Sequence, residues 1–212
     1  MKVLQIENGT FVENCYLVVD AEARECAIVD PGEAAGVILR RLEQEAARPV
    51  GIWLTHAHLD HVLGVPKVRA ATGVPVYLHA ADRPLYDHVP DQAAAFGLRA
   101  DSLPPPDRYY AHGEVMRVGA LSFSVRHTPG HSPGSVALVG EGVVFGGDVL
   151  FQGSIGRTDL PGGDFETLIA SIERELLVLP DTTIVYCGHG PATTIGAERR
   201  SNPFLTGAFP VA

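Results

Sequence analysis

Residues Thr55–His61, with the sequence Thr-His-Ala-His-Leu-Asp-His, gather four metal-ligand side chains directly after a short apolar run. In an extended segment, residues two apart point to the same face, so the imidazoles of His56 and His58 can reach one ion. Asp60 and His61 follow a bend and can serve a second ion nearby. Neutral imidazole suits zinc and iron, and a carboxylate adds a hard oxygen ligand. The stretch therefore predicts a metal centre at the end of a strand.

Three further segments, each at the end of a predicted strand, hold side chains that can complete the metal shell. They are His127–Ser132 with its two histidines, Gly146–Asp148 and Gly188–Gly190. In α/β architectures, sites gather in the loops beyond strand ends, so we expect these segments to converge on the first stretch. The glycines in the second segment let the backbone approach closely.

Apolar runs and turn residues predict strands in two batches, each followed by helices. The predicted strands cover Leu17–Val19, Cys26–Val29, Gly51–Leu54, Val74–Leu78, Val115–Val118, Leu121–Val125, Ser135–Val139, Val143–Phe145 and Thr183–Tyr186. Helical spacing predicts one helix over Ala35–Ala46, which Pro49 ends, and another over Phe165–Leu179. Residues 82–108, rich in proline, aspartate and alanine, predict a long surface excursion that can act as a lid. Two β-rich halves with helices outside predict an α/β fold, the four-layer α/β/β/α sandwich.

The composition is that of an ordinary globular chain. The 212 residues are 46% hydrophobic and 19% charged, which excludes a disordered chain and indicates one domain, 1–212. A formal charge of −9 argues against nucleic acid as a partner, and no apolar run approaches the ~20 residues of a membrane span. The three cysteines, Cys15, Cys26 and Cys187, are odd in number and widely spaced, so we expect no disulfide framework. The acidic Glu7 comes too early in the chain for a signal peptide. We therefore expect a cytoplasmic protein with no membrane partner.

The metal-ligand side chains along the chain, taken in order, resemble the metallo-β-lactamase superfamily, and the resemblance covers nearly the whole chain. The pattern consists of His56-x-His58-x-Asp60-His61, His131, Asp148 and His189. The resemblance implies two ions, the first held by His56, His58 and His131 and the second by Asp60, His61 and His189. Asp148 would bridge the two ions and, with Asp60, would be a catalytic carboxylate. His127 has no ligand role in the pattern and is expected to be structural.

Within the superfamily, the chain looks most like glyoxalase II, the thioester hydrolase that acts on S-D-lactoylglutathione. Antibiotic-hydrolysing members lack the bridging aspartate that Asp148 offers, so a true β-lactamase is not expected. Asn14–Val18 and Val29–Gly32 add to the likeness. Two departures concern glutathione: the chain stops soon after His189, where full-length glyoxalase II has an added helical domain, and Asp159 stands where that enzyme has an aromatic residue. Short bacterial glyoxalase II-like proteins share this ending.

The resemblance implies a hydrolase that cleaves a small-molecule thioester and binds two divalent metal ions. Zinc is the expected metal at both positions, and iron is the alternative at one or both of them. A bridging hydroxide would attack the carbonyl, the first ion would stabilise the oxyanion and the second would hold the leaving thiolate. Arg157 is expected to contact an anionic part of the substrate. A persulfide dioxygenase is the alternative, because Gly156–Asp159 also resembles that group. Its single ferrous ion would take His56, His131 and Asp148.

Overall fold

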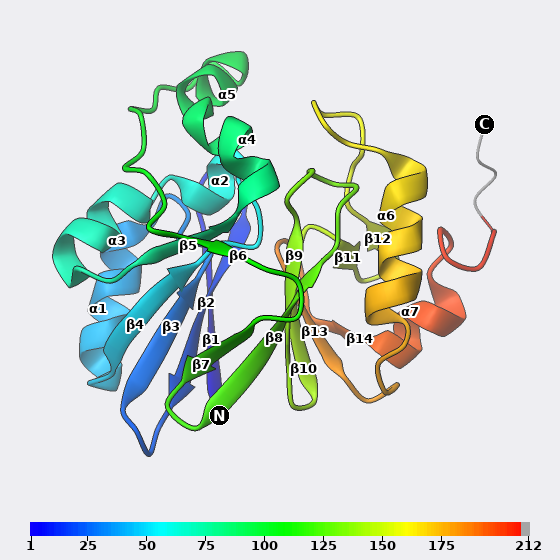
Figure 1. Ribbon diagram of the computed structural model, residues 1–212, viewed down its shortest axis with the longest axis horizontal. Helices are drawn as coiled ribbons and strands as arrows, with labels where there is room; N and C mark the ends of the chain where they lie inside the picture. Colours follow the sequence, from blue (N-terminus) through cyan, green and yellow to red (C-terminus); the bar gives the residue numbers. More distant parts are fainter. Residues whose placement is uncertain (209–212) are drawn as a thin grey trace.

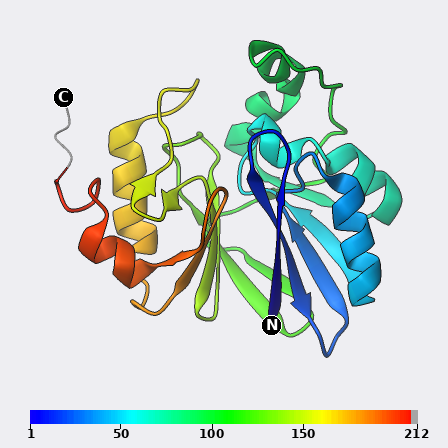
Figure 2. The ribbon, with the colours of Figure 1, turned by 180° about the vertical axis from the view of Figure 1, so that it is seen from behind.

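The computed structural model describes residues 1–208 as four layers (Figure 1). Two six-stranded β-sheets pack face to face, and helices cover the outer face of each sheet. Figure 2 shows the same layers from behind. The predicted four-layer α/β/β/α sandwich is thereby confirmed. Residues 209–212 of the predicted domain lie outside the described part of the chain.

The first sheet brings the carboxyl ends of several parallel strands to one edge. Its strands, in the order in which they lie side by side, are β1 (Lys2–Asn8), β2 (Glu13–Asp20), β3 (Glu25–Val29), β4 (Arg48–Trp53), β5 (Val76–His79) and β6 (Arg108–Tyr110). β1, β2 and β3 pair antiparallel, whereas β3 to β6 pair parallel. Asp30 after β3 and Thr55–His61 after β4 therefore emerge at the same edge.

The second sheet presents its own strand ends to that edge. Its order is β14-β13-β10-β9-β8-β7, with β7 (Val115–Val118), β8 (Leu121–His127), β9 (Val136–Gly140), β10 (Val143–Gly147), β13 (Ile184–Cys187) and β14 (Thr193–Thr194). β11 (Leu150–Phe151) and β12 (Ser154–Ile155) form a separate hairpin. Because β10 and β13 are parallel neighbours, Asp148 and His189 follow them side by side.

The helices form the two outer layers and one end of the molecule. They are α1 (Ala35–Glu45), α2 (Leu59–Val62), α3 (Val65–Thr72), the 3₁₀ turn η1 (Ala80–Asp82), α4 (Arg83–Asp87), α5 (Val89–Ala95), α6 (Phe165–Ser171), the π-helical turn η2 (Ile172–Leu176) and α7 (Ile195–Ser201). α1 and α3 lie outside the first sheet, and α6 and α7 lie outside the second (Figures 1 and 2). α4 and α5 rise above the end of the first sheet.

Three apolar cores separate the four layers. β2 shows how one strand serves two of them, because successive side chains of a strand point to opposite faces. Leu17 and Val19 face the core under α1 and α3, whereas Tyr16 and Val18 face the core between the sheets. Every residue of β2 is buried, as expected for a strand covered on both faces.

The first helix ends differently from the prediction. It stops at Glu45, because Ala46 adopts a left-handed conformation with a φ of 49° and its backbone N–H bonds the last turn. Pro49 does not end the helix; it lies inside β4. A register shift in the pairing of β3 with β4 accommodates this proline, which cannot donate to the ladder.

Other differences lie at the edges and in short elements. Thr183–Tyr186 was predicted as the last strand, but β14 and α7 follow it. The predicted surface excursion 82–108 contains α4, α5 and β6. The predicted helix Phe165–Leu179 is α6 continued by η2, which ends at Leu176. β1 was missed because, in this edge strand, Ile6 and Asn8 alone are fully buried, so its apolar alternation is weak.

Candidate metal centre

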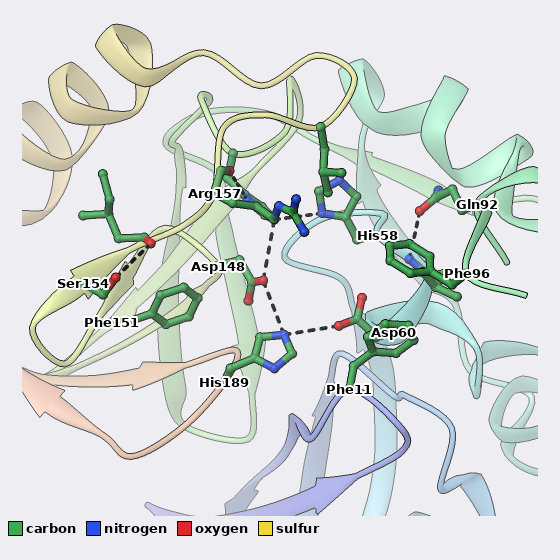
Figure 3. A pocket seen from close by; sticks show the side chains of 14 residues that line it. Phe11, His58, Asp60, Gln92, Phe96, Asp148, Phe151, Ser154, Arg157 and His189 are labelled. Carbon is green, nitrogen blue, oxygen red and sulfur yellow. Dashed lines mark hydrogen bonds and ion pairs between the residues drawn. The ribbon is translucent and has the colours of Figure 1, made fainter. Parts of the chain in front are cut away.

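The segments identified in the sequence meet at one end of the two sheets (Figure 3). Thr55–His61 follows β4 and runs into α2, and His131 lies in the loop between β8 and β9. Asp148 directly follows β10, and His189 follows β13. The structure thus brings all the predicted ligand side chains to one place, in loops at strand ends and, for Asp60 and His61, in the short helix α2 that follows such a loop.

His56, His58 and His131 form the first group of side chains, and all three are buried. The Nε2 atoms of His56 and His131 lie 3.3 Å apart, and the Nδ1 atom of His58 lies 2.8 Å from His131 Nε2. His58 is extended, with φ −70° and ψ 149°, immediately before α2. The extended backbone places its imidazole and that of His56 on one face, as the sequence predicted.

Asp60, His61 and His189 form the second group. Asp60 Oδ2 lies 3.2 Å from His189 Nε2 and 3.8 Å from His61 Nε2. Asp60 and His61 lie in the short helix α2, which provides the predicted bend after the extended segment. His61 is fully buried, whereas Asp60 and His189 reach the adjoining cavity.

Asp148 lies between the two groups. Its Oδ1 atom is 3.4 Å from His61 Nε2, and its Oδ2 atom is 3.4 Å from His189 Nε2 and 3.6 Å from His131 Nε2. The backbone at Gly188 lies so close to the Asp148 carboxylate that a Cβ atom on residue 188 would collide with it. Any other residue at this position would therefore displace the carboxylate from its place between the two groups.

The residues present fit a pair of divalent cations. Among residues 1–208, the buried atoms without a hydrogen-bond partner include Nε2 of His61 and Oδ1 of Asp148, which lie 3.4 Å apart at the centre of the two groups. Buried polar atoms are nearly always paired, so unpaired atoms gathered at one point indicate a missing partner. Five imidazoles and two carboxylates form a donor set that suits zinc or iron.

The charges around the two groups differ. Burial lowers the pKa of His58 to about 3, and burial together with the neighbouring imidazoles lowers that of His56. Burial alone would lower the pKa of His189, but hydrogen bonds to Asp148 and Asp60 raise it to about 10. The pKa of His61 is also raised, because the same two carboxylates outweigh its burial. His56 and His58 are therefore neutral, whereas His61 and His189 hold protons, when no cation is bound.

Asp30 supports both groups, and sequence reasoning missed it. Its carboxylate accepts hydrogen bonds from the backbone N–H of Thr55 at 2.7 Å and from the Thr55 hydroxyl at 2.6 Å. Asp30 Oδ2 also lies 3.1 Å from His61 Nδ1, and Thr55 Oγ1 lies 3.0 Å from His56 Nδ1. Asp30 was noted within Val29–Gly32, as part of the likeness to glyoxalase II. An acidic residue after a buried strand at the same sheet edge was the available signal.

Asp82 in η1 and Gln92 in α5 form hydrogen bonds with the metal motif, and neither residue was identified from the sequence. Asp82 is buried; it accepts hydrogen bonds from the backbone N–H of Ala57 at 2.9 Å and from the Ser132 hydroxyl at 2.7 Å. Gln92 in α5 accepts from the backbone N–H of Leu59 at 3.1 Å and donates to the carbonyl of Ala57 at 3.1 Å. Nothing in their local sequence distinguishes them from other polar residues.

Arg157 lies at the site, but its guanidinium is engaged. Its Nε and Nη2 atoms donate to the two carboxylate oxygens of Asp159 at 2.6 and 2.7 Å. Its backbone carbonyl lies 2.8 Å from His131 Nδ1. His127 lies outside the ligand groups, with its ring stacked on His79 and its Nε2 atom 2.9 Å from the carbonyl of Pro133.

A cavity of about 390 Å³ opens over the two groups and reaches Asp60, Asp148 and His189. Its walls are largely apolar, and they include Phe11, Phe96, Phe151, Ile155 and Leu160. In Figure 3, Phe151 lies on one side of the ligand side chains, with Phe11 and Phe96 on the other. Small-molecule sites combine such apolar walls with a few convergent polar groups.

Comparison with known proteins agrees with this geometry. Residues 8–189 match the model of the metallo-beta-lactamase superfamily, and the chain belongs to this superfamily. The chain is a metal-dependent hydrolase of that superfamily. A relative from Haemophilus influenzae, hydroxyacylglutathione hydrolase GloC, is 43% identical over 97% of this chain and 98% of its own length. The superfamily resemblance inferred from the ligand pattern is confirmed.

Solved structures share the fold over nearly the whole chain. BLEG-1 B3 metallo-beta-lactamase is 44% identical with a TM-score of 0.91, covering 97% of this chain and 100% of that one. TTHA1623 in a di-iron-bound form is 45% identical with a TM-score of 0.87, covering 95% and 100%. ETHE1 from Myxococcus xanthus is 28% identical with a TM-score of 0.80, covering 98% and 85%. Since BLEG-1 has the name of a β-lactamase, the expectation that this chain is not one stays a prediction.

In the part of the chain that the structure describes, no helix is both long enough and apolar enough to cross a membrane.

Proposed function

We propose that the protein hydrolyses a small-molecule thioester, as glyoxalase II-like enzymes do. The observation that carries the proposal is the convergence of the two ligand groups on the two oxygens of Asp148, beneath a cavity large enough for a small substrate. The 43% identity with a relative named as a hydroxyacylglutathione hydrolase supports the same chemistry. In the reaction, a water oxygen bonds to the acyl carbon and the C–S bond breaks, which leaves a carboxylate and a thiol.

His56, His58 and His131 would hold one divalent cation, Asp60, His61 and His189 would hold the other, and Asp148 would contact both. When bound, the pair would supply a hydroxide nucleophile at neutral pH and Lewis-acid polarisation of the carbonyl.

The supporting hydrogen bonds set the tautomers of the rings. The hydroxyl of Thr55 donates to Asp30, so its oxygen accepts from Nδ1–H of His56 and leaves the Nε2 lone pair facing the site. The Asp30 carboxylate accepts from Nδ1–H of His61 in the same way. The carbonyl of Arg157 accepts from Nδ1–H of His131. Each of these three rings therefore turns its Nε2 atom toward the ligand groups, and His61 loses the proton on that atom when a cation binds.

Metal analysis and two activity assays test the proposal. Protein purified without added metal should contain up to two divalent ions per chain, zinc before iron, and should cleave thioesters such as lactoylglutathione with release of thiol. We expect KM to differ little between glutathione thioesters and thioesters of other thiol carriers. The reason is that the guanidinium of Arg157 already donates hydrogen bonds to both carboxylate oxygens of Asp159. Absence of thioester cleavage by the fully metal-loaded protein would overturn the proposal. Hydrolysis of a β-lactam is measured under the same conditions, because a true β-lactamase is not expected.

A persulfide dioxygenase is the second candidate, and two observations favour it. ETHE1 from Myxococcus xanthus, a persulfide dioxygenase neighbour in fold, is 28% identical over 98% of this chain. His56, His131 and Asp148 also lie close enough to hold a single ferrous ion, with His131 Nε2 3.3 Å from His56 and 3.6 Å from Asp148.

The double variant His61→Ala/His189→Ala separates the two functions, because it alters only the second group. Thioester hydrolysis should fall by about 10³ or more, equivalent to about 4 kcal/mol of transition-state stabilisation. A dioxygenase loaded with ferrous ion should instead keep much of its persulfide-dependent oxygen uptake. Oxygen uptake that survives in the variant, with negligible hydrolysis by the unaltered protein, would favour the second candidate.

A further inference from the structure

A second cavity, of about 450 Å³, adjoins the one over the ligand groups. The two share His58, Gln92, Phe96 and Leu160, so they lie side by side next to the first ligand group. Beyond these residues the second cavity extends between α4 and α5 on one side and the loop at 160–161 on the other. Its size falls within the range of ~300–1,000 Å³ typical of small-molecule sites.

The walls of this second cavity are largely apolar, and the cavity is an open groove, because Pro84, Ala95 and Phe96 along it are exposed. Leu85 and Ala95 contribute from α4 and α5, and Phe96 packs edge-on against Phe11 with ring centroids 5.2 Å apart. Gln92 fixes α5, because its side chain bonds backbone groups of the metal motif and also donates to the carbonyl of Leu85 at 2.8 Å. A preformed apolar cavity binds hydrocarbon with little cost in ordering its own side chains.

The charges lining the two cavities do not suit a strongly anionic occupant. Within residues 1–208, Arg157 is the sole arginine or lysine that lines either cavity, and both oxygens of Asp159 bind its guanidinium. Asp91 adds a negative charge at the second cavity. An uncharged hydrocarbon therefore matches this space better than a carboxylate-bearing peptide does.

The second cavity adjoins His58 of the first group and is lined by no member of the second group. We infer that it is an acyl subsite, which holds the hydrocarbon part of the acyl group of an apolar thioester, while the thiol carrier lies toward Asp60 and His189. The inference rests on the proposed function, in which the oxyanion lies at the first group and the leaving thiolate at the second. The substrate class is accordingly a thioester of a medium-length aliphatic acid.

Chain-length dependence tests the inference. The metal-loaded protein is assayed with N-acetylcysteamine thioesters from acetyl to octanoyl, so that the neutral carrier stays constant. We expect kcat/KM to rise about fourfold for each methylene that becomes buried, until the cavity is full. Ala95→Trp places a bulky ring in the cavity and should flatten this rise, and Leu160→Ser should weaken it. Ala94→Trp is the matched control, because Ala94 is exposed on the same helix and does not line the cavity, and it should keep the rise.

Binding of uncleavable thioethers distinguishes failure of the inference from failure of the proposed function. S-octyl-N-acetylcysteamine should bind at least about tenfold more tightly than the S-ethyl compound by calorimetry, and Ala95→Trp should abolish the difference. If thioesters are not cleaved but this preference persists, the proposed function is wrong and the apolar subsite stands. Equal cleavage at every chain length, with no effect of Ala95→Trp, overturns the subsite and leaves the hydrolase intact.

Discussion

Asp148 contacts side chains of both ligand groups, so its replacement should affect both cations at once. Asp148→Ala removes the carboxylate that lies within 3.6 Å of His61, His131 and His189. We expect the variant to lose metal and hydrolytic activity but to keep its fold, because the side chain belongs to none of the three apolar cores. Metal analysis and circular dichroism check this. A folded variant that retains its full metal content would refute the central role of Asp148.

Asp30 allows a finer test, because asparagine tolerates its positive φ of 49°. Asp30→Asn keeps the shape but replaces a carboxylate oxygen, which accepts from Thr55 and His61, with an amide donor. We expect metal affinity to fall by about 10–100-fold, measured by competition with a chelator. Asp20→Asn is the control: that carboxylate also accepts backbone N–H groups, at Ala23 and Ala120, so it should lower stability alone. Equal metal affinities in the two variants would contradict the supporting role of Asp30.

Four of the ligands could be predicted from their local spacing, and His131, Asp148 and His189 from their places after predicted strands and from the resemblance, whereas the supporting residues could not be predicted. His56, His58, Asp60 and His61 fall within one short stretch after a strand. Asp82 reaches Ala57 across 25 residues of chain, and that contact exists only after β5 has paired with β4. Support of this kind is decided by tertiary packing rather than by local pattern.

At the scale of elements, one side chain, Gln92, hydrogen-bonds the short helix α5 to the metal motif, and Val89 and Ala93 pack in the same apolar core as Leu59. Gln92→Ala removes the hydrogen bonds to Ala57, Leu59 and Leu85 and leaves buried backbone groups unpaired. We expect a loss of about 1–3 kcal/mol in the free energy of unfolding and faster amide exchange over 83–95. Hydrogen exchange with mass spectrometry measures both the local and the global effect. Gln44→Ala on α1 is the control, because Gln44 bonds only the exposed Arg41 among the interactions described. Unchanged exchange over 83–95 in Gln92→Ala would show that α5 is held by other contacts.

The elements that the sequence predicted are those with strong apolar periodicity. β10 and β13 are largely buried, and their apolar runs predicted them to within one or two residues. β14 has two residues, too few for any period, and β11 and β12 are equally short. Pro49 was wrongly predicted to end the first helix. It lies in β4 instead, where a register shift in the pairing of β3 with β4 accommodates it, and such a shift cannot be inferred from the sequence of the helix.

At the scale of the whole molecule, the cation site joins the two halves of the sandwich. The first sheet supplies the Thr55–His61 stretch, and the second supplies His131, Asp148 and His189. Asn14 in β2 reinforces the junction, because its side chain donates to the carbonyls of Cys187 and Gly190 at 3.1 and 2.8 Å. Cation binding should therefore stabilise the complete fold rather than one loop, since the ligands belong to both sheets.

His58, His61 and His189 should lower the stability of the metal-free protein on either side of pH ~6.5. A folded-state pKa of about 10 for His189, raised by Asp148 and Asp60 against the effect of burial, gives stability that is fully present below pH ~6.5 and lost as the pH rises toward about 10. His61 acts in the same direction. His58 acts oppositely: burial lowers its pKa to about 3, so folding is penalised as the pH falls below ~6.5 and the unfolded chain takes up the proton.

Cation ligation requires neutral imidazoles, so the loaded protein should lose the decline above pH 6.5, and binding at pH 8 should release protons from the second group. Thermal unfolding of metal-free and loaded protein at pH 6.5, 8 and 9 measures the first effect. Calorimetry in two buffers with different ionisation enthalpies measures the second. His189→Gln should reduce both effects, because glutamine carries no titrating proton. Metal-free stability that rises between pH 6.5 and 9, or proton release that is the same in His189→Gln, would show that the second group is not protonated before the cation binds.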